Sequence, residues 1–300
     1  HPRQPGGRHG LFRAQSESVA IVKPMALLRN PRVAFGMLVL VALLVAALGA
    51  QWLSASDPLE QDLLNSFQRP GIAGGDPAHA LGTDSLGRDI LARLLYGARP
   101  ALLVAFVAAL CAGVLGTVLG LAAGYAGGWL DAAISRLVDI WMSFPSVLLC
   151  IVLAAVLGAG LHTVIIAIIV IDWTRFCRVV RAETMLQKSH DYVASAVTIG
   201  LGPARIVASE ILPNVAPLLL TLFTLEMGIA IVIEAILAFV GLSVSSGMPT
   251  WGGLIQEGRL YVNQAWWLMA APMACIIVAV LGLNALGDGL RDVLDPVKAR

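Results

Sequence analysis

The chain has 300 residues, of which 58% are hydrophobic and only 13% are charged, and its formal net charge is +1. A soluble domain is about half apolar and about a quarter charged, so this composition predicts an all-α polytopic membrane protein embedded in the lipid bilayer. The small net charge offers no bulk attraction to nucleic acid, and we expect no such partner. The four cysteines lack C-x-x-C spacing, which argues against a disulfide framework and a zinc site.

Six apolar runs are long enough to predict six transmembrane helices, at about 20 residues for each crossing of the bilayer core. The fourth run is the weakest, because Asp172 and Arg175 fall in its second half, where their three-residue spacing lets them pair on one helix face. A membrane domain over residues 33–290 is expected between an N-terminal segment, 1–32, and a C-terminal tail, 291–300. The predicted spans are 33–53, 101–125, 137–157, 163–180, 215–242 and 266–286.

Lysine and arginine residues predict the orientation of the spans. The first 32 residues hold six of these cations against one acid, Glu17, and further cations follow the fourth span and close the chain. The positive-inside rule then places both termini and the loop 182–214 in the cytoplasm, and the acidic loop 54–99 outside.

The outer loop ends in a pattern that predicts an amphipathic helix on the outer face, before the second span. Thr83 or Asp84 can cap this helix, and apolar residues recur at every fourth position up to Leu94. Its polar residues are Asp84, Arg88 and Asp89. Two interpretations remain open: a plain structural elbow, or a brace on which an extracellular partner rests.

The second span carries Gly116, Gly120 and Gly124 at four-residue spacing. Small residues in this arrangement allow two helix backbones to approach closely. The stripe is expected to pack within this chain, or else to form a seam with a second subunit.

The loop 182–214 is polar and punctuated by glycine and proline between two long apolar runs. Long connections in a compact protein tend to be functional. Its apolar pattern predicts a short helix over residues 192–199 on which a partner docks, a break at Gly200, and a second helical pattern that runs to Pro213.

The sequence holds no recognisable catalytic constellation. None of the three lysines follows a glycine, so a Walker A loop is impossible, and neither H-E-x-x-H nor G-x-S-x-G occurs. We therefore expect a transport subunit that is not an enzyme and binds no cofactor or metal itself. Glu226 and Glu234 lie in the fifth span without a cation on the same helix, and each is either a structural hydrogen-bonding residue or part of a substrate path.

Several long motifs resemble the permease subunits of bacterial ATP-binding-cassette importers of the dipeptide, oligopeptide and nickel class, and the last of them favours the C-type subunit. The resemblance implies a type I importer permease fold that forms half of the translocation pathway. It also implies a second homologous permease subunit, two cytoplasmic subunits that bind ATP and Mg²⁺, and an extracellular or periplasmic substrate-binding protein. The motifs cover residues 81–99, 136–145, 234–243, 249–252 and 284–296.

The resemblance makes the polar loop the family's coupling or "EAA" loop, whose short helix contacts an ATPase. The sequence departs from the family pattern, since Ala194 replaces the usual glutamate and Ser195 the first alanine. An ionic contact made by that glutamate is then missing, or is supplied by Asp191 or Glu210. The residues assigned to the coupling loop are Asp191, Tyr192, Val193, Ala194, Ser195, Ala196, Gly200, Leu212 and Pro213.

The cargo is expected to be a short peptide. A bare transition metal would favour imidazole or thiolate ligands along its path, and His162 is the only histidine near a span. A nickel or nickel-chelate importer of the same family is the alternative, and a channel or transporter independent of ATP is a more distant one.

Overall fold

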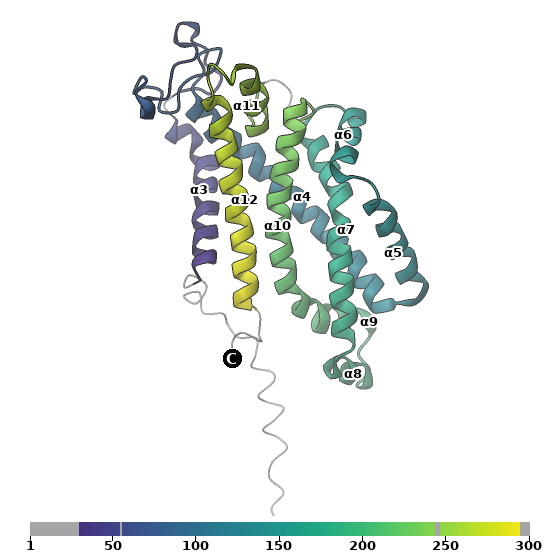
Figure 1. Ribbon diagram of the computed structural model, residues 1–300. Helices are drawn as coiled ribbons and strands as arrows, with labels where there is room; N and C mark the ends of the chain where they lie inside the picture. The colour runs from purple at the N-terminus through teal and green to yellow at the C-terminus, as the bar shows by residue number, and fades with distance from the viewer. Residues whose placement is uncertain (1–29, 55, 244–246, 295–300) are drawn as a thin grey trace, which may run out of the picture.

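The computed structural model describes residues 30–54, 56–243 and 247–294, so the expectations for residues 1–29 and 295–300 lie outside the described residues. Long helices form the bundle, with shorter helices at its two ends (Figure 1). The α-helices are α3 Pro31–Leu53, α4 Ile90–Ala126, α5 Gly128–Met142, α6 Ser146–Leu157, α7 Leu161–Lys188, α8 Asp191–Thr198, α9 Pro203–Ile206, α10 Leu212–Val240, α11 Trp251–Gly258 and α12 Trp267–Leu294.

The long helices pack side by side, and α4 crosses behind α10 and α7 (Figure 1). The short helices α8 and α9 lie at one end of the bundle, which we call the α8 end. The loop over residues 56–89 and α11 lie at the opposite end, which we call the loop end. Arg32 at the start of α3 pairs with Asp292 near the end of α12 at 3.2 Å, so both chain ends of the described bundle lie together at the α8 end.

An all-α membrane fold is confirmed. Among the described residues, α3, α4, the continuous α9–α10 segment and α12 are each long and apolar enough to cross a bilayer, and the bent pair α5–α6 makes a fifth candidate. The fourth expected span, residues 163–180, corresponds to α7, which is 28 residues long. Asp172, Arg175 and Arg178 interrupt its apolar stretch, so α7 is more polar than the other candidate spans.

The prediction of a separate helix on the outer face is wrong in two respects. The helix begins later than expected, and it is continuous with the second span. Asp89 caps the helix, because its carboxylate accepts a hydrogen bond from the backbone N–H of Ala92 at 2.8 Å. The Asp84 carboxylate instead accepts from the backbone N–H groups of Leu86 and Arg88, which closes a turn ahead of the helix. From Ile90 the helix continues without a break into the second span as α4.

The third span was expected to be one helix over residues 137–157, and this is also wrong. The structure has two helices, α5 and α6, that meet at an angle of 83° across a break of three residues. Pro145 explains the break, since it has no backbone N–H to donate and disfavours helical geometry at the residue before it, Phe144.

The glycine stripe of α4 packs against α7 within this chain, which is the first of the two expectations stated above. A Cβ at Gly116 would lie 2.5 Å from the Cβ of Phe176, and one at Gly124 would lie 2.7 Å from the Cβ of Thr184. Gly120 is equally confined, at 2.8 Å from a backbone oxygen of α7. Any side chain at these positions would force the two helices apart.

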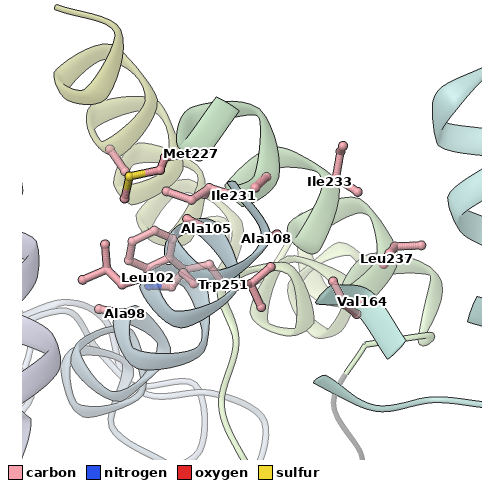
Figure 2. Close-up of a cluster of buried hydrophobic side chains, with 14 of the residues drawn as sticks. Ala98, Leu102, Ala105, Ala108, Val164, Met227, Ile231, Ile233, Leu237 and Trp251 are labelled. Carbon is pink, nitrogen blue, oxygen red and sulfur yellow. The ribbon is translucent and has the colours of Figure 1, made fainter. Parts of the chain in front are cut away.

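The largest hydrophobic core joins α4, α10 and α11. The small side chains Ala105 and Ala108 of α4 let Met227 and Ile231 of α10 pack closely, and Trp251 of α11 closes the cluster (Figure 2). The indole N–H of Trp251 donates to a backbone carbonyl of α4 at 3.0 Å, so this buried ring is fully satisfied.

Candidate functional site

The short helix α8 is held at the α8 end by one buried face. Val193 and Ala196 are buried against residues from the ends of α4, α7 and α10, including Leu121, Val180 and Val215. Their spacing of three residues places both side chains on the same side of a helix. The predicted helix over residues 192–199 differs from the observed α8, Asp191–Thr198, by one residue at each end.

Gly200 ends α8 in the way the sequence indicated. Its φ is +84°, a left-handed conformation that glycine adopts without steric cost. Its backbone N–H donates to the carbonyl of Val197 at 3.0 Å, and the next N–H, from Leu201, donates to Ala196 at 3.1 Å. These two bonds close the helix and turn the chain sharply toward α9.

Tyr192 links α8 to the two long helices that flank it. Its hydroxyl donates to Oε1 of Gln187 in α7 at 2.7 Å and accepts from Nδ2 of Asn214 in α10 at 3.4 Å. Asn214 also donates to the carbonyl of Glu210 at 2.6 Å. Burial of the Tyr192 ring raises the pKa of its hydroxyl, so this group remains a hydrogen-bond donor at neutral pH.

The last turns of α7 are fixed to α4 and α5. Arg181 forms an ion pair with Asp131 near the start of α5, with a second contact between Nη2 and Oδ2 at 2.8 Å. The ammonium of Lys188 donates to the carbonyl of Tyr125 at 2.6 Å and lies 5.2 Å from the centre of its ring. Polar contacts therefore join the end of α7, on which α8 packs, to α4 and α5, so a displacement of α8 would be passed to the long helices.

The outward face of α8 carries small polar and apolar side chains, and two exposed apolar residues, Val197 in the helix and Ile199 just after it, lie at its C-terminal end. Val197 is 56% exposed and Ile199 is 75% exposed. Ala194 and Ser195 are also exposed, and the Ser195 hydroxyl is bonded within the helix to the carbonyl of Asp191 at 2.8 Å. Exposed apolar side chains on a short projecting helix are suited to insertion into a partner's groove.

The replacement of glutamate by Ala194 leaves the outward face of α8 with one acidic side chain, Asp191, which lies in its first turn. Asp191 is exposed and so is available to a partner. Glu210 accepts a hydrogen bond from the neighbouring Ser209 hydroxyl at 3.0 Å and is half-buried. Of the two proposed substitutes for the missing carboxylate, Asp191 therefore has the better position.

The second helical pattern of the coupling loop contains a feature that the sequence did not indicate. Residues Val207–Ile211 form a π-helical turn between α9 and α10. Leu212 and Pro213 then begin α10. Pro213 lacks a backbone N–H, and the wider π turn accommodates the helix bonds around it. A local propensity scan cannot anticipate this, because a π turn has no characteristic sequence.

The two acidic residues of the fifth span have different partners. Glu226 faces Arg175 of α7, with Nη1 at 3.2 Å and 3.4 Å from its two carboxylate oxygens. Glu234 accepts a hydrogen bond from the buried hydroxyl of Ser243 at 3.0 Å. Asp172 approaches Nε of Arg175 only to 3.9 Å. The sequence pointed to the pair Asp172–Arg175 but did not indicate that Arg175 also reaches Glu226.

A buried ionic network stabilises the loop end. Arg93 bridges Asp84 at 2.5 Å and Glu257 of α11 at 2.7 Å, and Arg88 contacts the same two carboxylates at 2.6 Å and 2.8 Å. Asp84 is 2% exposed and Arg93 is 4% exposed. Sequence reasoning singled out Asp84 and Arg88 and missed Arg93 and Glu257, whose separation of 164 residues leaves no local signal.

Asp89 is not a member of that network. Its second carboxylate oxygen, Oδ1, lies 3.0 Å from the ring nitrogen Nδ1 of His79. It therefore joins the loop to the start of α4 and has a structural role. In the described part of the chain, no group of three or more histidine, cysteine and acidic side chains could hold a metal ion.

Comparison with known proteins places this geometry in a family. The family described as "Binding-protein-dependent transport system inner membrane component" matches residues 116–300, which is more than half of the chain. The chain belongs to this family. It is a permease of a binding-protein-dependent transport system, and α8 with its following turn occupies the coupling-loop positions that the motif resemblance assigned.

Relatives of this permease cover most of its length. A di/tripeptide transport system permease protein of Pseudomonas aeruginosa is 37% identical over 87% of this chain and 86% of its own length. A dipeptide transport system permease protein of Escherichia coli is 39% identical over 89% of this chain and 90% of its own length. A solved structure of the MetNI methionine ABC transporter, in inward-facing conformations, matches with a TM-score of 0.56 and 21% identity over 67% of this chain and 96% of that chain. This last match supports the type I fold alone.

Proposed function

We propose that this permease forms half of the translocation pathway of an ATP-driven importer of short peptides and couples that pathway to a cytoplasmic ATPase. The observation that carries the cargo assignment is the set of relatives at 37–39% identity over nearly the whole chain that are named di/tripeptide or dipeptide permeases. The coupling assignment is supported by α8, which exposes Val197 and the following Ile199 and packs on helix ends that polar contacts join to α4, α5 and α10. Nickel as cargo is not favoured by these relatives.

The eight-residue α8 is about 12 Å long, a size that fits a groove on a partner as a rigid helix. In this proposal two ATPase subunits bind ATP and Mg²⁺, close on each other, and shift the α8 of this chain together with that of a sister permease. Tyr192 passes this displacement to α7 and α10, and Arg181 and Lys188 of α7 pass it on to α5 and α4. The permease pair then changes between inward-open and outward-open states as rigid bodies.

The free-energy requirement for this change is accessible. Inverting a two-state equilibrium from about 1:99 to about 99:1 takes roughly 5.5 kcal/mol of differential binding. The ATP-bound partners supply it through their contacts with both coupling helices. A receptor outside the membrane delivers the peptide to the loop end, and this orientation agrees with the charge bias and with the location of both chain ends at the α8 end.

Deletion of the subunit in a peptide auxotroph tests this function. Growth on di- or oligopeptides should fail in the deletion strain and return with the wild-type chain expressed from a plasmid. A nickel-dependent enzyme assayed in the same strains serves as the control. Unimpaired peptide uptake together with lost nickel-dependent activity would decide for the metal, and uptake that continues after ATP depletion would decide for a channel.

A further inference from the structure

A cavity of about 260 Å³ lies between α6, α7, α10 and α12. Apolar side chains of α10 form much of its wall, and its polar lining residues are Ser146, Arg175 and Asn284. Among the described residues that line it, Arg175 alone carries a charge. Arg175 lies in the middle of α7, so the cavity is at a depth where a half-exposed guanidinium must face either a water-filled path or protein.

The Arg175 guanidinium is held from one side and is open on the other. Nη1 contacts both carboxylate oxygens of Glu226, and Nε lies 3.9 Å from Asp172. The acidic side chains are only 5% and 2% exposed, whereas that of Arg175 is 35% exposed. A guanidinium has five N–H donors, and Nη2 has no partner in the described part of the chain. Glu226 therefore orients Arg175 while its free edge is available to the cavity.

The broken third span adds a second source of positive potential. Ser146 and Val147, the first two residues of α6, line the same cavity. Pro145 occupies the cap position and makes no side-chain capping bond, so the first N–H groups of this 12-residue helix are not capped by it. Helices that begin inside a membrane direct their positive ends toward anionic groups of the transported molecule.

The remaining polar groups are suited to the same ligand. Neither the hydroxyl of Ser146 nor the side-chain amide of Asn284 has a hydrogen-bond partner within the described ranges. Gly228 keeps the approach open, because a Cβ there would lie 3.2 Å from Oδ1 of Asn284. A guanidinium edge, an amide and a helix N-terminus around one space form a carboxylate-binding arrangement.

We propose that this cavity receives the terminal carboxylate of the peptide during its passage, with Arg175 and Asn284 as its ligands; the proposal rests on the proposed peptide-import function. The volume lies below the roughly 300 Å³ at which small-molecule pockets begin, so the cavity fits an end group and not a whole peptide. The pairing of Glu226 with Arg175 offsets the charge of Arg175. The carboxylate is consequently held weakly, as passage through a transport path requires.

The test uses the complete transporter in proteoliposomes, with its receptor saturated by one of two peptides. One is a dipeptide with a free terminal carboxylate and the other is its C-terminal amide, and receptor affinity for each is measured separately. The wild type should import the acid about tenfold faster than the amide, the factor expected from one charge-assisted hydrogen bond. Asn284→Asp places a negative charge in the cavity and should reduce this ratio to about one.

A matched control adds the same charge elsewhere. Gln51→Glu, at the exposed end of α3, should leave the acid-to-amide ratio at its wild-type value. An unchanged ratio in Asn284→Asp, in a transporter that assembles and hydrolyses ATP normally, overturns the proposal. If that variant does not assemble, the comparison of the two peptides in the wild-type transporter is decisive. Equal import rates of the acid and the amide would contradict a carboxylate site. A wild-type transporter that imports neither peptide refutes the peptide-import function instead.

Discussion

The hydroxyl of Tyr192 donates a 2.7 Å hydrogen bond to Oε1 of Gln187, which joins α8 to the last turn of α7. Together with the contact from Asn214 in α10, this bond makes Tyr192 a polar link between α8 and two of the long helices. A displacement of α8 by a partner would act on both helices through this link.

Tyr192→Phe tests the link. The variant keeps the ring that packs in the α8 cluster and removes only the hydroxyl, a loss of about 1 kcal/mol for a neutral hydrogen bond. We expect normal membrane abundance and a lower number of peptides imported per ATP hydrolysed. Ser143→Ala is the control, because the Ser143 hydroxyl, at the end of α5 and away from α8, donates only to the nearby carbonyl of Ile140. Equal coupling ratios for Tyr192→Phe and wild type would show that the link does not transmit motion.

Gly200→Val should uncouple transport. A β-branched residue resists the left-handed conformation that ends α8, so the docking helix would be displaced while the long helices remain intact. The measurement is peptide uptake with receptor-stimulated ATPase activity, normalised to the amount of subunit in the membrane.

Gly202→Val provides the matched control for the Gly200 variant. Gly202 lies two residues along the same turn and has φ −67°, which valine adopts readily. A Cβ at this position would have no atom of the described residues within 4 Å, so valine is tolerated there. If the two variants transport peptide equally well or equally poorly, the left-handed conformation of Gly200 is not what transport requires.

Arg93→Met should destabilise the loop end. The substitution removes one of the two guanidiniums that bridge Asp84 and Glu257, while Arg88 still contacts both carboxylates, so the expected loss is that of a charge-assisted hydrogen bond, about 2 kcal/mol. A lower thermal midpoint of the purified complex is expected. Arg259→Met is the control. It removes a guanidinium that lies over the ring of Phe239, 5.0 Å from its centre, and not one that bridges two carboxylates. An unshifted midpoint in Arg93→Met would mean that the network contributes little stability.

Single cysteines in a variant without the native four test the orientation. Leu64 is 97% exposed at the loop end, and Ser189 is exposed at the α8 end. Leu64→Cys should react with an impermeant thiol reagent applied outside intact cells, and Ser189→Cys only after permeabilisation. The reverse pattern would overturn the positive-inside assignment.

The sequence was sufficient where local rules apply. The apolar spacing around Val193 and Ala196 and the glycine at position 200 define α8 to within one residue, because helix periodicity and left-handed glycine caps are properties of a few neighbouring residues. The glycine stripe of α4 could also be recognised in the sequence, although only the structure shows that its partner is α7.

The sequence was insufficient where residues distant along the chain decide the outcome. The start of α4 was misplaced because the Asp84 carboxylate binds a turn and two arginines, one of which also binds Glu257. Asp89 was then left to cap the helix. Likewise Arg175 was assigned to Asp172 on its own helix, while its closer contact is with Glu226, 51 residues away.

The most direct test of the central claim is ATP hydrolysis by the purified chain and by the reconstituted complex. The chain alone should hydrolyse no ATP, since it lacks a Gly-Lys pair for a phosphate-binding loop. The complex with its ATPases, the sister permease and peptide-loaded receptor should hydrolyse ATP and import peptide together. Hydrolysis by the chain alone, or peptide import by the complex without ATP, would contradict the assignment of this protein as an ATPase-coupled permease subunit.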